Sequence, residues 1–202
     1  MSERAQHLPA DERRAATVEA VVALAAEQNP SDITTSAIAK RMGLTQGALF
    51  RHFPTKDAIV QAVMSWVTDR MLARIARAIE GHPSPIAALE AIFDTHVKFV
   101  MQHPGVPRVI FGQLQQPGNT VAKQMAAALL QRYGDRLRSL LKDGKTRGTL
   151  DADLDVDAAA TAFIGTIQGL VMQSLLAGDP KQIGRNAPGV FAIYLRGIGA
   201  AP

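Results

Sequence analysis

The chain has 202 residues, of which 47% are hydrophobic, and this allows one large folded domain or two small ones with a sizeable core. It contains no cysteine, which excludes disulfide scaffolds, thiolate zinc sites and a cysteine nucleophile. The net charge of +4 is too small by itself to indicate a nucleic-acid partner. The polar start lacks the apolar core of a secretory signal, and no run of about 18 uncharged apolar residues occurs, so we expect a cytoplasmic protein without a membrane span.

Apolar residues recur at helical spacing throughout, which predicts an all-α fold of about nine helices. The first helix is expected over about 9–27 and is broken by Asn29-Pro30-Ser31-Asp32. Two short helices follow, over about 35–42 and 45–52. Later helices are expected over about 56–80, 86–102, 106–115, 119–145, 156–176 and 188–198.

Residues 33–56 have the pattern of a helix-turn-helix. Thr35 and Thr45 occupy the expected N-caps of its two helices, and Gly43 can adopt the positive φ of the tight turn between them. Leu49 and Phe53 are expected to face inward. The residues left near the outside are Thr45, Gln46, Gly47, Phe50 and Arg51. A helix that opens with Thr-Gln-Gly suits the major groove, because Gln can pair with adenine, Thr can touch a thymine methyl and Gly permits close approach.

The charges within residues 33–56 are all positive. Lys40, Arg41, Arg51 and Lys56 lie in this window, and no Asp or Glu does. A surface that faces DNA phosphates needs such a composition, because a carboxylate there would repel the backbone.

The same window resembles the DNA-binding domain of the TetR family of repressors. The matching elements are Thr35, Ile38-Ala39, Gly43-Leu44-Thr45, Phe50-Arg51-His52-Phe53 and Lys56. The resemblance implies base contacts from Thr45, Gln46, Gly47 and Arg51, and phosphate contacts from Thr34, Thr35, Ser36, His52 and Lys56. Phe50 departs from the family pattern, which usually has a tyrosine there. It keeps the apolar contact but loses one hydrogen bond to a phosphate, worth on the order of 1 kcal/mol.

The segment 156–176 has too many apolar residues for one stripe, so this helix should be buried on two sides. Gly165 and Gly169 lie four residues apart and would let a partner helix approach, although ordinary packing within the chain would also explain them. The stretch 148–176 resembles the penultimate helix of the family and its lead-in. The resemblance implies a homodimer formed through about 156–176 and 188–198.

The family holds its ligand in the middle of the chain, where residues 80–147 match only in helical layout. Candidates to line a mostly apolar cavity are Met64, Phe93, His96, Val100, Phe111, Met125, Phe163 and Gln168. The alternative for His96 is a core histidine with a backbone partner, and for the Met and Phe residues it is ordinary core packing. His82, His96 and His103 lack the spacing of a metal site, so neither a metal nor another cofactor is expected.

The helix-turn-helix pattern and the resemblance to the TetR family together imply a DNA-binding domain over 1–55 and a ligand-sensing and dimerisation domain over 56–202. The predicted function is a ligand-responsive repressor that binds a palindromic operator as a homodimer and is released by a small, largely apolar inducer. The alternatives are a ligand-independent or architectural DNA-binding protein, or an activator. An enzyme is not expected, because the chain has no glycine-rich phosphate loop, nucleophile elbow, zinc signature or paired carboxylates on one helix face.

Overall fold

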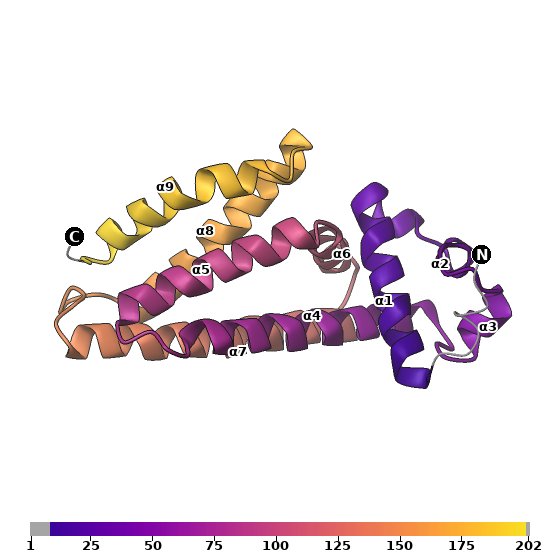
Figure 1. Ribbon diagram of the computed structural model, residues 1–202, viewed down its shortest axis with the longest axis horizontal. Helices are drawn as coiled ribbons and strands as arrows, with labels where there is room; N and C mark the ends of the chain where they lie inside the picture. The colour runs from indigo at the N-terminus through magenta and orange to yellow at the C-terminus, as the bar shows by residue number, and fades with distance from the viewer. Residues whose placement is uncertain (1–8, 201–202) are drawn as a thin grey trace. The chain divides into compact units, whose positions relative to one another are not determined.

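The computed structural model describes residues 9–200, and every regular element within them is a helix, which confirms the all-α prediction (Figure 1). The nine α-helices and one short 3-10 helix of this range are α1 (Ala10–Glu27), η2 (Pro30–Asp32), α2 (Thr35–Arg41), α3 (Gln46–Phe50), α4 (Lys56–Ile79), α5 (Pro85–Gln102), α6 (Gly105–Leu114), α7 (Val121–Thr146), α8 (Val156–Ala177) and α9 (Gln182–Gly197).

The ends of the short helices are set by threonine caps. The predicted cap at Thr35 is wrong by one residue, because Thr34 has the extended backbone of a cap and its Oγ1 accepts from the amide three residues on, at 3.0 Å. Thr45 caps α3 in the same way at 3.2 Å, as predicted, and Thr55 caps α4 at 3.0 Å. Gly43 has a φ of +68°, which confirms its role in the turn between α2 and α3.

The last helix begins earlier than predicted. The sequence predicts a start near Pro188, but α9 begins at Gln182 and Pro188 lies inside it on the exposed side. The physical reason is burial: Ile183 and Ala187 continue the buried stripe that carries Phe191. Burying this extra turn outweighs the hydrogen bond that a proline cannot donate.

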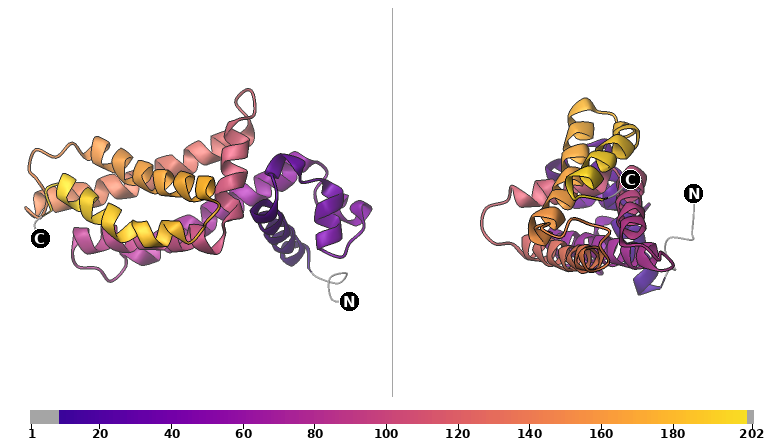
Figure 2. Two further views of the ribbon diagram at one scale, coloured as in Figure 1. Left: turned by 90° about the horizontal axis from the view of Figure 1, so that it is seen from above. Right: turned by 90° about the vertical axis from the view of Figure 1, so that its left-hand side faces the viewer.

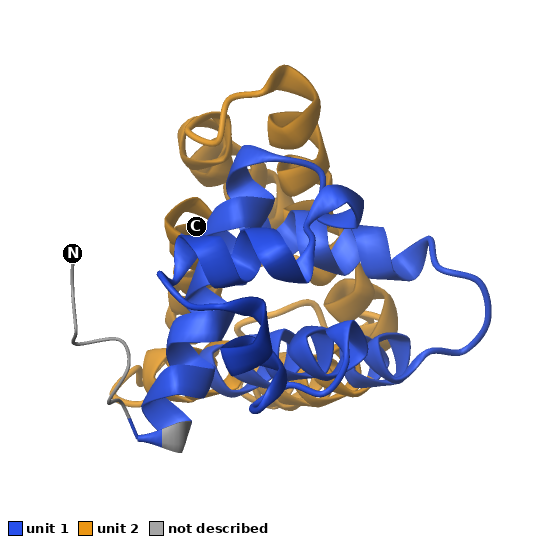
Figure 3. Ribbon diagram, turned by 90° about the vertical axis from the view of Figure 1, so that its right-hand side faces the viewer, with its two compact units in different colours: residues 1–70, 103–127 blue, residues 71–102, 128–202 orange. Residues whose placement is uncertain are grey.

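By packing, the chain divides into two compact units (Figure 3). The first takes in the described part of Met1–Arg70 together with His103–Ala127, and the second takes in Met71–Gln102 with the described part of Ala128–Pro202. In the first unit, α6 and the start of α7 are therefore grouped with the N-terminal helices. The functional boundary expected between residues 55 and 56 stays a prediction.

In the first unit, α1 packs against both α6 and α2, and α2 packs against α3. The approach of α6 to α1 depends on Gly105, the first residue of α6. A Cβ added at Gly105 would overlap the carbonyl oxygen of Val22 and lie 2.9 Å from the amide nitrogen of Ala26. Only glycine allows the two backbones to come this close.

In the second unit, α5 packs against α8 and α9, and α8 and α9 lie side by side (Figures 1 and 2). An aromatic cluster forms much of this core. Phe93 lies 4.8 Å from Phe191 and 5.6 Å from Phe163, measured between ring centroids. Tyr194 lies 5.4 Å from Phe163, and its hydroxyl donates to the carbonyl of Ala159 at 3.1 Å.

Candidate nucleic-acid interface and ligand site

The outer face of α3 carries the residues predicted to read DNA bases. Leu49 and Phe53 are 1% and 0% exposed, which confirms that they anchor this helix to the core. The opposite side is therefore turned to solvent. The residues exposed on it are Thr45, Gln46, Gly47, Phe50 and Arg51. Phe50 is 40% exposed, so its ring lies on this outer face.

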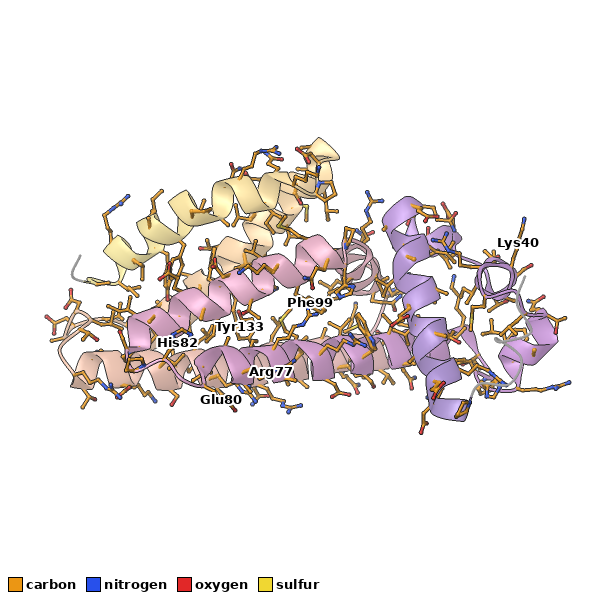
Figure 4. The ribbon with its side chains drawn as sticks, viewed as in Figure 1. Lys40, Arg77, Glu80, His82, Phe99 and Tyr133 are labelled. Carbon is orange, nitrogen blue, oxygen red and sulfur yellow. The ribbon has the colours of Figure 1, made fainter. Side chains whose placement is uncertain are left out.

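The predicted phosphate-contact residues border this face. Thr34, Ser36 and Lys56 are exposed, and Thr35 and His52 are half-buried. The Lys56 ammonium donates to the carbonyl of Ser31 at 3.3 Å, an exposed bond that leaves the charge accessible to solvent. Lys40 at the end of α2 is also exposed (Figure 4).

His52 is oriented by Arg13, an arginine of α1. Arg13 Nη1 lies 2.6 Å from His52 Nε2. Because a guanidinium can only donate, Nε2 accepts and the neutral ring carries its proton on Nδ1. This contact with Arg13 favours the tautomer in which Nδ1 is the donor atom of His52.

Arg41 is less available to DNA than the absence of Asp and Glu from residues 33–56 indicates. Its guanidinium donates two bonds to the carboxylate of Glu27, at 2.9 and 2.8 Å. These bonds hold the pKa of the Glu27 carboxyl below its ordinary value. Glu27 lies outside residues 33–56, so only the fold shows that one of the four cations in that window is paired.

The eight candidate ligand residues fall into both units. Met64, Phe111 and Met125 belong to the first, where Met64 is fully buried beside Met125. Phe93, His96, Val100 and Phe163 belong to the second and lie in or beside its core. Gln168 does not join them, because it lies on the exposed side of α8. Five residues after Phe163, a helical side chain lies roughly on the opposite face.

His96 has a side-chain partner, Tyr133, and not the backbone partner of the sequence-based alternative. Its Nδ1 lies 3.3 Å from the hydroxyl of Tyr133, and both side chains sit beside the aromatic cluster. Burial lowers the pKa of His96 from 6.5 to about 4, and it raises the pKa of Tyr133. The pair is therefore uncharged at neutral pH. Within residues 9–200, no group of three His, Asp or Glu side chains is placed to hold a metal ion.

His96 makes the stability of the fold depend on pH. Its folded pKa of about 4 lies below the ordinary 6.5, so the unfolded chain binds more protons between these values. This contribution is complete above about pH 6.5 and is lost progressively as the pH falls toward 4. At pH 5 the loss should be about 2 kcal/mol, or roughly 4–8 °C in melting temperature.

The test compares thermal melts at pH 7.5 and pH 5 for the wild type and His96→Gln. The variant should lose this part of the pH dependence, whereas His82→Gln, a change at an exposed histidine, should keep it. A His96→Gln profile parallel to that of the wild type would show that another group is responsible.

The outer face of α8 carries no charged side chain along one stripe. Its members recur every three or four residues and are Ala158, Ala162, Gly165, Gly169, Met172 and Leu176. Met172 is 44% exposed and Leu176 is 81% exposed. A Cβ added at Gly165 or Gly169 would meet nothing within 4 Å. Packing within the described chain therefore does not explain these glycines.

By length and composition alone, α8 is long and apolar enough to cross a membrane. Core helices meet the same criterion. Residues on one side of α8, Phe163, Ile167 and Leu170 among them, are buried in the second unit.

Comparison with known proteins supports the resemblance found in the sequence. The family model described as "Bacterial regulatory proteins, tetR family" matches residues 18–63. A second model, "Tetracyclin repressor-like, C-terminal domain", matches residues 115–190. Among the relatives, the nucleoid occlusion factor SlmA of Vibrio cholerae serotype O1 is 24% identical over 146 residues, which cover 72% of this chain and 74% of the relative.

Solved structures of low identity share the fold. The transcriptional regulator FadR from Bacillus subtilis, in complex with stearoyl-CoA, matches with a TM-score of 0.79 and 21% identity over 91% of this chain and 98% of that one. AibR in complex with isovaleryl coenzyme A and operator DNA matches with a TM-score of 0.73 and 16% identity over 94% and 100%.

Proposed function

Because the chain belongs to the TetR family of bacterial regulatory proteins, whose members are DNA-binding transcription factors and not enzymes, we propose that it is a repressor released from its operator by a small-molecule ligand. The observation that carries this proposal is the exposed start of α3. Thr45, Gln46 and Gly47 are turned outward by the buried Leu49. An exposed helix with this sequence supports reading of base edges in the major groove.

The repressor acts as a homodimer on a palindrome, since one short helix reads too few bases for a specific site. The uncharged stripe on α8 supports this assembly. Ile193 on α9, which is 62% exposed, adds to the exposed apolar surface of this helix pair. An apolar surface left open on two neighbouring helices is typical of an interface between protein chains.

The ligand is a largely apolar molecule with an uncharged hydrogen-bonding group, held in the second unit. The neutral pair of His96 and Tyr133 beside aromatic rings supports this class, because a pair without charge favours a carbonyl or hydroxyl over a carboxylate. The thioester carbonyl of an acyl-coenzyme A is such an uncharged acceptor. FadR and AibR were both solved in complex with acyl-coenzyme A thioesters.

A second candidate is a DNA-binding protein that acts without a ligand. It is supported by the relatives named as nucleoid occlusion factors, which match over most of both chains. The two candidates predict different responses of DNA binding to small molecules.

Selection of genomic fragments by the purified chain separates these functions. A repressor should enrich a short near-palindrome close to promoters, and one of a panel of acyl-coenzyme A thioesters should release it. Enrichment without release by any thioester would exclude an acyl-coenzyme A ligand, and retention of all fragments alike would contradict both specific functions.

Lys56→Gln should weaken DNA binding about equally on all sequences, because Lys56 is proposed to contact a phosphate. It should also reduce the slope of log affinity against log salt by about 0.9 per bound chain. The measurement is fluorescence anisotropy over a series of salt concentrations. The matched control is Lys98→Gln on α5, which removes an exposed lysine from the second unit. An unchanged slope for Lys56→Gln would exclude the contact.

A further inference from the structure

We propose that Thr35 and Gln46 form a hydrogen-bond chain from a DNA phosphate to a base, and that this chain makes the protein select a base with an exocyclic amino group, adenine first and cytosine second. The inference rests on the proposed binding of operator DNA. It gives Thr35 a second role as the residue that positions Gln46, and it predicts one base of each half-site.

The two side chains are already joined in the structure without DNA. Gln46 Nε2 donates to Thr35 Oγ1 at 2.7 Å, across eleven residues of sequence. Each is the first residue of its helix, Thr35 of α2 and Gln46 of α3. Neither is used for capping, because the preceding threonines, Thr34 and Thr45, cap the two helices. The Thr35 hydroxyl and the Gln46 amide therefore remain available to each other and to DNA.

A phosphate at Thr35 fixes the direction of every bond in the chain. Phosphate oxygens can only accept, so the Thr35 hydroxyl must donate its single proton to the phosphate. Thr35 Oγ1 is then an acceptor toward Gln46 and must face the amide nitrogen. The orientation present in the free protein is thus the one that a phosphate requires, and it leaves Gln46 Oε1 for the base.

An acceptor presented to the major groove discriminates among the four bases. Adenine offers the N6 amino group to Oε1, and its N7 can accept the second hydrogen of Gln46 Nε2. Cytosine offers only the N4 amino group. Guanine and thymine present carbonyl oxygens there, and these would repel Oε1. An untethered glutamine could turn its amide over and donate to them.

The test measures binding to four operators that differ only at the base pair whose preference is lost in Gln46→Ala. The wild type should prefer adenine, with cytosine second, over guanine and thymine by roughly ten- to a hundredfold. Thr35→Val keeps the branched shape but removes the hydroxyl. It should weaken binding to the best operator and reduce this preference to less than about threefold, whereas Thr35→Ser should retain it.

Ser36→Ala is the matched control, since it removes another predicted phosphate contact from α2 without touching Gln46. It should weaken binding equally to all four operators. The inference is overturned if Thr35→Val also weakens all four equally, if the wild type prefers guanine or thymine, or if Gln46→Ala changes no base preference. Failure to select any operator would instead contradict the proposed function.

Discussion

Gly105→Ala is expected to destabilise the chain by about 3 kcal/mol and to weaken operator binding at least tenfold. The added methyl group would overlap the carbonyl of Val22 and crowd the amide of Ala26, both in the backbone of α1. A flexible side chain could turn away, but a helix backbone must shift as a whole. The cost therefore lies at the upper end of the range of about 1–3 kcal/mol for overpacking.

The effect on DNA binding follows from the packing of the first unit. The helix α6 packs on α1, and α1 packs on α2, which precedes the turn into α3. A displacement of α1 is thus passed to the helices that carry Thr35 and Gln46. Base contacts need accurate placement, since their hydrogen bonds weaken steeply with distance and angle.

Gly112→Ala on the same helix is the matched control. Its added Cβ would meet only the side chain of Pro30, at 3.7 Å, which is ordinary contact. This variant should melt at or slightly above the wild-type temperature, because alanine favours a helix more than glycine does. Gly105→Ala should melt roughly 6–12 °C lower, by calorimetry. Equal melting temperatures and operator affinities for the two variants would show that the backbone approach at Gly105 is not needed.

The elements that sequence reasoning placed well have local signals. Gly43 had to adopt a positive φ in the turn, and Leu49 and Phe53 had to face inward at helical spacing. The N-cap of α2 was predicted wrongly, because Thr34 and Thr35 are neighbours and either could cap the helix by sequence. Only the backbone geometry shows that Thr34 is the cap.

Features that depend on distant segments could not be predicted. The bond between Arg13 and His52 joins residues 39 apart, and the bidentate pair of Arg41 and Glu27 joins residues 14 apart. Glycine is needed at position 105 because the backbone of α1 lies close to it. The sequence around Gly105 contains no pattern that predicts this contact. Such contacts decide which cations and donors remain for DNA, so they matter most at the candidate site.

Gly165→Leu is expected to convert a dimer into a monomer with little loss of monomer stability. Gly165 lies on the uncharged stripe of α8, where packing within the described chain leaves open space around it. Leucine also favours a helix more than glycine does, so the monomer should melt no lower. If two copies pack along this stripe, a leucine side chain would hold the helices apart where glycine lets them approach closely. We expect the dimer dissociation constant to rise at least a hundredfold.

Analytical ultracentrifugation over a range of protein concentrations measures this change. As the dimer is lost, operator binding should become weaker, and the bound fraction should depend more steeply on protein concentration. Ser139→Leu is the matched control, because it adds the same side chain to an exposed position on α7. It should remain dimeric. A Gly165→Leu variant that stays dimeric would show that this stripe is not the interface, and a monomeric wild type would contradict the homodimer itself. A dimer binds both half-sites of a palindrome at once, which makes its affinity much higher than that of a single chain. The loss of dimerisation should therefore reduce operator affinity more than the loss of any one base contact.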